Sequence, residues 1–278
     1  MDSNKLIANK YRIITKIGSG SFGSIFKGIN VRTNEKVAIK IENVSDELKL
    51  LKHESNIYRI LSNIVGVPKI KWYGKDESYY YMVIDLYGKS LQDLIDIKNK
   101  LSFKTTLQIG INILNILMKI HEVGFIHRDI KPENFLLTLD KPTKICLIDF
   151  GLSKLYVINN KHIDFKYKKK FLGTLNFASI NSHKFCEQSR RDDLESLSYM
   201  LLYFYFGELE WINKETNIIE NFEIENINIK EKKETLIKRI KNLPKVLLEF
   251  HENITKLTFE ERPNYEKYIE SFMDELNK

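Results

Sequence analysis

The sequence predicts an α+β fold, in which a small lobe with an antiparallel β-sheet and one main helix precedes a larger, mainly helical lobe. Short runs of alternating apolar and polar residues fill residues 11–41 and are separated by turn residues. From Leu91 onward, apolar residues recur at helical spacing instead. The pattern changes near Gly88–Ser90, so we expect two lobes, residues 1–88 and 89–278, that together make one domain.

The small lobe is predicted to contain five strands and one helix. The strands are expected over residues 11–17, 24–29, 37–41, 70–73 and 79–86. Residues 46–61 have apolar side chains near helical spacing, which predicts the helix of this lobe. Strands joined by short connections favour antiparallel pairing.

The larger lobe is predicted to be helical because its long segments repeat apolar residues about every 3.6 positions. The predicted helices cover residues 107–121, 194–206, 232–241, 244–257 and 265–276. Residues 144–148 resemble a short strand.

Length and composition are those of a globular protein. A chain of 278 residues buries about three quarters of its unfolded surface, and 43% hydrophobic with 29% charged residues is close to average. With two cysteines, Cys146 and Cys186, and no leader-like amino terminus, we expect a reducing intracellular compartment, cytoplasm or nucleus. The longest apolar run, Tyr199–Phe206, is far shorter than the roughly 20 residues of a membrane span, so we expect none.

Positive charge is concentrated in residues 152–191, which contain nine basic and two acidic residues in a chain of net charge +7. Four of these lysines lie close together: Lys166, Lys168, Lys169 and Lys170. Such a run can be a solvated loop or a binding surface. No nucleic-acid-binding motif accompanies it, so nucleic acid is not an expected partner.

Three glycines, Gly18, Gly20 and Gly23, have the G-x-G-x-x-G spacing that lets backbone N–H groups approach phosphate oxygens. A strand-like run follows Gly23, whereas a dinucleotide-binding loop is followed by a helix. The loop is therefore expected to connect a β-hairpin, and the alternative is a glycine-rich hairpin without a ligand.

Further motifs follow in order along the chain. Val37–Lys40 ends a strand with an ammonium group that could pair with phosphates, and Glu54 on the next helix is its expected partner. His127–Asn134 contains His-Arg-Asp and an asparagine, and Asp149–Gly151 is Asp-Phe-Gly. Each motif alone has an ordinary structural explanation, but the ordered set favours a shared chemical function.

Together these residues resemble the eukaryotic protein kinase family, which implies a bilobal kinase fold and the use of ATP and Mg²⁺. In this family Lys40 would contact the α- and β-phosphates, and Asp129 would accept or orient the proton of the substrate hydroxyl. Asn134 and Asp149 would supply oxygen ligands to Mg²⁺. Lys131 would approach the γ-phosphate, and its spacing from Asp129 resembles that of serine/threonine kinases.

Other positions follow from the same resemblance. Thr174 would bridge Asp129 and Lys131. The nucleotide pocket would include the gatekeeper Ile84, a hinge at Asp85, Leu86 and Tyr87, and the small-lobe residues Ile17, Gly18, Gly20, Gly23, Ile25 and Ala38.

Two stretches are similar to the casein kinase I family in particular. Ser179–Asn181 stands where most kinases have Ala-Pro-Glu, and Glu187–Leu197 follows. The resemblance implies that Asp193 ties the backbone of the catalytic loop, the alternative being an ordinary helix cap. It covers essentially the whole chain and implies a monomeric catalytic domain.

The family prefers acidic or already phosphorylated substrates, so Lys166, Lys168, Lys169 and Lys170 are expected to contact acidic protein substrates. Two departures put recognition of pre-existing phosphate in doubt. Asn176 replaces an expected arginine, and residues 217–221 replace an expected basic cluster. Many kinases have, at the position of Arg262, an arginine that pairs with the glutamate of Ala-Pro-Glu, but here Asn181 offers it no charge.

The segment between Asp149 and Asn181 has no obvious phosphorylation site that would control the activity, so constitutive activity is expected. The first alternative function is a pseudokinase that acts as a binding module, which the presence of Lys40, Asp129, Asn134 and Asp149 disfavours. The second is nucleic-acid binding through the basic segment, which would be insensitive to Asp129→Asn.

Overall fold

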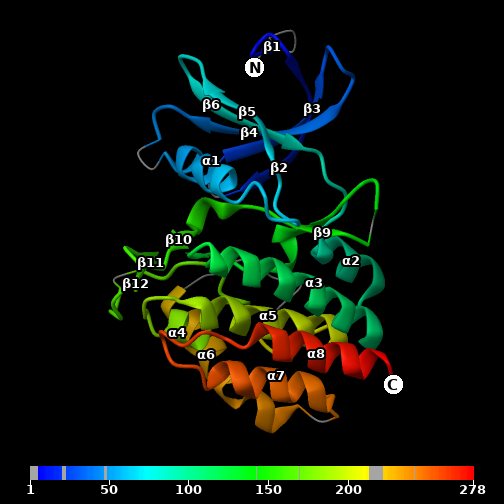
Figure 1. The fold of residues 1–278 in the computed structure, drawn as a ribbon, viewed down its shortest axis with the longest axis vertical. Helices are drawn as coiled ribbons and strands as arrows, with labels where there is room; N and C mark the ends of the chain where they lie inside the picture. The colour runs from blue at the N-terminus through cyan, green and yellow to red at the C-terminus, as the bar shows by residue number, and fades with distance from the viewer. Residues whose placement is uncertain are drawn as a thin grey trace. The chain divides into compact units, whose positions relative to one another are not determined.

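The computed structural model describes residues 6–20, 23–46, 49–141, 143–168, 170–212, 222–240 and 242–278 (Figure 1). The chain divides into two compact units. The first comprises Met1–Lys89 and Leu136–Gly151, and the second comprises Ser90–Phe135 and Leu152–Lys278. The expected α+β class is confirmed.

The first unit is built on an antiparallel sheet. Among the described residues it has six strands, in the order β1-β2-β3-β4-β6-β5 (Figure 1). Their bounds are β1 Leu6–Ile7, β2 Tyr11–Gly20, β3 Gly23–Asn30, β4 Lys36–Asn43, β5 Ile70–Lys75 and β6 Tyr79–Asp85. The five predicted strands are present, and β1 is a short addition that pairs with β2. As predicted, the glycine-rich segment connects a hairpin, β2 to β3.

Strand alternation places the core of this unit on one face of β4. Val37, Ile39 and Ile41 are buried in a cluster with Tyr11 and Val83. Because successive side chains of a strand point to opposite faces, Ala38 and Lys40 lie on the other face. The apolar pattern of β4 therefore determines the face on which Lys40 is presented.

Helix α1, Leu50–Ile60, begins later than the predicted residue 46. The carboxylate of Glu42, which is buried, accepts hydrogen bonds from the backbone N–H groups of Leu50 (3.0 Å) and Leu51 (3.2 Å). It thereby satisfies the first donors of the helix. The helix packs against β4, β5 and β6.

The second unit is mainly helical. Its helices are α2 Leu91–Lys98, α3 Phe103–Glu122, α4 Ile180–His183, α5 Arg190–Phe206, α6 Phe222–Arg239, α7 Lys245–Thr255 and α8 Tyr265–Leu276. Two short antiparallel strand pairs are also present. β7 Phe125–Ile126 pairs with β10 Lys154–Leu155, and β11 Val157–Ile158 pairs with β12 Lys161–His162. Two 3₁₀ turns cover Pro132–Asn134 and Phe150–Leu152. The predicted strand near residue 146 is β9 Ile145–Leu147, which belongs to the first unit and pairs with β8 Phe135–Leu137.

Helix α3 packs against α5 and α8, and α5 packs against α7 (Figure 1). Gly110 permits the close approach of α8, because a Cβ atom there would lie 2.7 Å from the ring of Phe272. Three predicted helix starts were too late. Helix α3 is capped by Ser102, which accepts from Thr105 N, α5 is preceded by its cap residue Ser189, and α6 extends back to Phe222. Among the helices described, none has the length and apolar character that crossing a membrane requires.

Candidate active site

Lys40 lies at the centre of a charge cluster in the first unit. Its Nζ is 2.7 Å from Glu54 Oε2 on α1 and 2.9 Å from Asp149 Oδ1. Glu54 is the partner that the sequence predicts for Lys40. The direct ion pair with Asp149 was not predicted, because the two residues are far apart in the chain.

The two carboxylates keep Lys40 charged. Burial alone would lower the pKa of Lys40, but the charges of Glu54 and Asp149 outweigh it and raise this pKa above its ordinary value. Burial raises the pKa of Glu54, and Lys40 opposes that rise. A buried ammonium with acidic neighbours is a stable cation that can contact anionic phosphate oxygens.

Asp149 has an unusual backbone conformation. Its φ angle of 65° is in the left-handed region, which is unfavourable for residues other than glycine. Its backbone N–H donates to the hydroxyl of Tyr58 at 3.1 Å. The ring of Tyr58 in turn packs edge-on against Phe150, with ring centroids 5.1 Å apart. Tyr58 therefore positions Asp149, a role that no sequence motif indicated.

The small-lobe residues that are predicted to bind the nucleotide include several that pair with one another across neighbouring strands of the sheet. Gly18 pairs with Ile25, and Ile25 pairs with Lys40. Ala38 pairs with Ile84 at the end of β6. These residues thus occupy neighbouring positions, as a common binding surface requires.

Other predicted nucleotide residues are placed as follows. Ile17 is exposed on β2, and Gly20 pairs with Gly23 at the hairpin. Gly23 has a φ of 137°, and a Cβ atom there would collide with the carbonyl oxygen of Ile41. Ser21 and Phe22 of the loop lie outside the described residues.

The predicted hinge follows β6. Asp85 pairs with Lys71 at 2.8 Å, so its side chain has a partner within the sheet. Leu86 and Tyr87 are half-buried, and burial raises the pKa of Tyr87. The following Gly88 donates from its backbone N–H to the carbonyl of Leu137 at 2.8 Å, which fixes the end of the hinge within the first unit.

A second group of predicted residues converges in the other unit. The hydroxyl of Thr174 donates to Asp129 Oδ1 at 2.7 Å, and Lys131 Nζ is 2.8 Å from Asp129 Oδ2 and 2.9 Å from Thr174 Oγ1. Thr174 therefore bridges Asp129 and Lys131, as the family resemblance implies. Both carboxylate oxygens of Asp129 are held, which determines the direction of this side chain.

Asn134 supports the same carboxylate. Its Nδ2 donates to the backbone carbonyl of Asp129 at 2.8 Å and approaches Asp129 Oδ2 at 3.3 Å. Because the amide nitrogen of Asn134 faces Asp129, the amide oxygen of Asn134 points away from Asp129. An amide oxygen and the carboxylate of Asp149 are hard oxygen donors, which fit Mg²⁺.

Asp193 ties the backbone of the catalytic loop. Its carboxylate accepts from the N–H groups of His127 (2.7 Å) and Arg128 (2.8 Å) and contacts His121 Nε2 at 2.9 Å. Burial would raise the pKa of Asp193, but the hydrogen bonds and charges of His121 and His127 lower it. The alternative of an ordinary cap is wrong, because the cap of α5 is Ser189.

The predicted substrate lysines separate into different environments. Lys166 and Lys170 are exposed, whereas Lys168 is 16% exposed and its Nζ is 2.7 Å from Glu187 Oε1. Lys169 lies outside the described residues. Lys168 thus has a buried partner, which separates it from the two exposed lysines.

Glu187 is a buried acid that sequence reasoning did not single out. Its side chain is fully buried and contacts both Lys168 and Lys154, the latter at 3.1 Å. Its backbone N–H donates to the carbonyl of Lys166 at 2.8 Å, and Lys168 N–H donates to Phe185 O at 2.6 Å. The acid therefore fastens residues 166–168 to residues 185–187.

The departures from the family pattern have the following surroundings. The backbone carbonyl of Asn176 accepts from Trp211 Nε1 at 2.8 Å. The exposed side chain of Arg262 forms an ion pair with Glu266, with Nη2 and Oε1 3.1 Å apart, so Arg262 has a local partner. Residues 217–221 lie outside the described residues.

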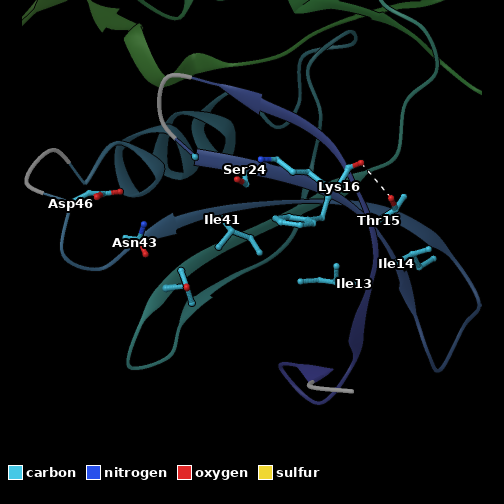
Figure 2. A pocket seen from close by; sticks show the side chains of 11 residues that line it. Ile13, Ile14, Thr15, Lys16, Ser24, Ile41, Asn43 and Asp46 are labelled. Carbon is cyan, nitrogen blue, oxygen red and sulfur yellow. Dashed lines mark hydrogen bonds between the residues drawn. The ribbon is translucent and has the colours of Figure 1, made fainter. Parts of the chain in front are cut away.

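A separate cavity of about 530 Å³ lies on the sheet of the first unit (Figure 2). Its lining includes Ile13, Phe26, Ile41 and Tyr79. Ile41 and Lys40 are adjacent on β4 and point to opposite faces, so this cavity is distinct from the charge cluster around Lys40.

Each group, taken by itself, is suited to phosphoryl transfer, a reaction in which the protein mainly positions reactants and neutralises charge. The family model of the protein kinase domain matches residues 11–273, and the chain belongs to this family. Its activity is therefore phosphoryl transfer from ATP to protein.

Replacing Thr174 tests the bridge to Asp129. We expect Thr174→Val to lower kcat by about tenfold or more, because the valine keeps the shape and removes the hydroxyl that orients the carboxylate. Thr174→Ser retains the hydroxyl and is expected to retain most of the activity. Steady-state kinetics with a peptide substrate measures both variants, and equal activity of the valine and serine variants would contradict this role.

Proposed function

We propose that the protein is a serine/threonine kinase of the casein kinase I type, which transfers the γ-phosphate of Mg-ATP to acidic protein substrates and is active without phosphorylation. The observation that carries this proposal is the arrangement of Asp129, Lys131 and Thr174. The hydroxyl of Thr174 and the ammonium of Lys131 meet on the carboxylate of Asp129, an arrangement that resembles serine/threonine kinases.

The residues have complementary roles in the proposed mechanism. Asp129, held at both oxygens, orients the substrate hydroxyl and accepts its proton as the bond to phosphorus forms. Lys131 neutralises negative charge on the transferred group. Lys40 holds the α- and β-phosphates. Mg²⁺ held by Asn134 and Asp149 would supply further neutralisation of the phosphates.

Contacts between the two motifs that resemble casein kinase I support the narrower family. Ser179 Oγ donates to Asp192 Oδ1 at 2.5 Å, and the backbone N–H of Ile180 donates to Glu195 Oε1 at 2.8 Å. The run Glu187–Leu197 thus holds the segment Ser179–Asn181. Acidic side chains of α5 provide an anchor here, in place of the Glu–Arg pair expected in most kinases.

The buried Glu187 supports constitutive activity. Kinase activation segments are commonly ordered when a phosphate pairs with basic side chains. Here Glu187 already pairs with Lys154 and Lys168. Burial would raise the pKa of Glu187, but hydrogen bonds from Lys168 and Lys154 lower it, so the acid is a permanent anion at neutral pH.

The first experiment measures transfer of the γ-phosphate from Mg-ATP to dephosphorylated casein and to acidic peptides that differ only in having Ser, Thr or Tyr. We expect transfer to Ser and Thr and little to Tyr. Asp129→Asn is expected to lower kcat by about a hundredfold or more, because the proton acceptor is lost. Absence of transfer by the wild type, with ATP binding intact, would instead favour a binding module.

Acidic recognition is tested with the double variant Lys166→Gln, Lys170→Gln. We expect a higher KM for an acidic peptide and a weaker dependence on salt, because exposed charges are screened within about 8 Å at physiological ionic strength. The matched control is Lys245→Gln, Lys256→Gln, two exposed lysines at the start of α7 and directly after its end. A wild-type preference for basic peptides would exclude the proposed substrate class.

Constitutive activity is tested by phosphatase treatment and by Glu187→Gln. We expect the dephosphorylated protein to retain its activity, and Glu187→Gln to lower kcat/KM by about tenfold, since two lysines lose their counter-charge. The Lys184→Gln variant, which removes an exposed pair with Glu234, is the control. Loss of activity on dephosphorylation would show that a phosphate is required.

A further inference from the structure

Lys233 on α6 is a buried lysine that no motif accounts for. It is 2% exposed, and its Nζ makes three contacts: the carbonyls of Leu175 (2.9 Å) and Ala178 (2.6 Å), and His183 Nε2 (3.0 Å). The rings of Tyr199 and Trp211 face the ammonium at 4.7 and 5.6 Å from their centroids.

The neighbouring histidine accepts a hydrogen bond from Lys233. Burial lowers the pKa of Lys233, and the negative charge of Glu195 opposes that fall. Asn226 Nδ2 donates to the backbone carbonyl of His183, so Asn226 Oδ1 accepts from His183 Nδ1 at 2.7 Å. Burial lowers the pKa of His183 to about 3, and the imidazole is neutral. Its Nε2 is then an acceptor. All three neighbours of Nζ are therefore hydrogen-bond acceptors, and Lys233 is the donor to them.

The two carbonyls belong to a turn that begins at Thr174. The backbone N–H groups of Phe177 and Ala178 both donate to Thr174 O, at 3.1 and 2.9 Å. Between the two carbonyls that Lys233 binds, Trp211 binds that of Asn176. A buried carbonyl that loses its hydrogen-bond partner is destabilising, so these donors specify the shape of the turn.

The same turn contacts the reacting groups, because Thr174 donates its hydroxyl to Asp129. We propose that Lys233 is a positioning residue for phosphoryl transfer: it fixes the turn Thr174–Ala178 and, through Thr174, the direction of the Asp129 carboxylate. This inference rests on the proposed kinase activity. It adds a hydrogen-bond donor from α6 to the acidic anchors that α5 provides at Ser179 and Ile180.

The test compares Lys233→Met with Lys232→Met. Both changes remove an ammonium from α6, but Lys232 binds only the exposed carbonyl of Glu210 in the described structure. We expect Lys233→Met to lower kcat/KM for the peptide about tenfold or more. The KM for ATP should stay within about twofold, because the nucleotide contacts assigned to Lys40 are in the other unit. Lys232→Met should resemble the wild type.

A double-mutant cycle separates positioning from a general structural role. If Lys233 acts through Thr174, the variant with both Lys233→Met and Thr174→Val should be no slower in kcat than Thr174→Val alone. Multiplicative losses would overturn the proposal. So would wild-type kinetics of Lys233→Met, or parallel losses of ATP affinity and peptide activity.

A second pair of variants applies if Lys233→Met fails to fold. His183→Leu removes one acceptor of the ammonium, whereas the side-chain oxygen of His183→Gln can replace it, so the glutamine variant should recover activity that the leucine variant loses. Amide hydrogen exchange at Phe177 and Ala178 gives a readout independent of catalysis, and should be faster in Lys233→Met or His183→Leu. Unchanged exchange overturns the proposal, whereas faster exchange without any wild-type transfer refutes only the kinase assignment.

Discussion

The buried carboxylate of Asp193 is the interaction on which the catalytic loop depends. Arg128 has a φ of 71°, in a region unfavourable for a residue with a side chain. Asp193 accepts the backbone N–H groups of His127 and Arg128, so a fixed negative charge holds two successive donors in this bend. The bend determines where the next residue, Asp129, projects. Without it, Lys131 and Thr174 would have no fixed carboxylate to contact.

Buried polar side chains elsewhere in both units are likewise matched by partners. Glu54 has Lys40, Glu187 has two lysines, and Lys233 has two carbonyls and an imidazole. Removing one partner of a buried charge costs about 3–5 kcal/mol, because the remaining charge is left without solvation. Such groups define one arrangement and penalise others, which suits a reaction that depends on positioning.

The sequence predicted the elements whose evidence is local. Alternation along β4 predicted the strand, and the position of Lys40 on the face opposite the core cluster follows from that alternation. Helix α8 has the predicted bounds because its apolar repeat is complete. The start of α1 could not be predicted, since its first N–H groups are satisfied by Glu42 from a neighbouring strand. Likewise, a run of lysines in the sequence does not reveal that Lys168 points to the buried Glu187.

The segment between Asp149 and α5 shows why these long-range contacts matter for function. Residues 166–168, near its middle, are held by Glu187 through Lys168 and through backbone hydrogen bonds. Further along, Lys233 fastens the carbonyls of the turn that begins at Thr174. Thr174 lies between these two attachments and contacts Asp129. A turn held on both sides loses little further conformational entropy when substrate binds, so its hydroxyl can be oriented before the reaction begins. In the proposed constitutive activity, charges that the chain itself supplies take the place of the phosphate that orders the activation segment in kinases that must be switched on.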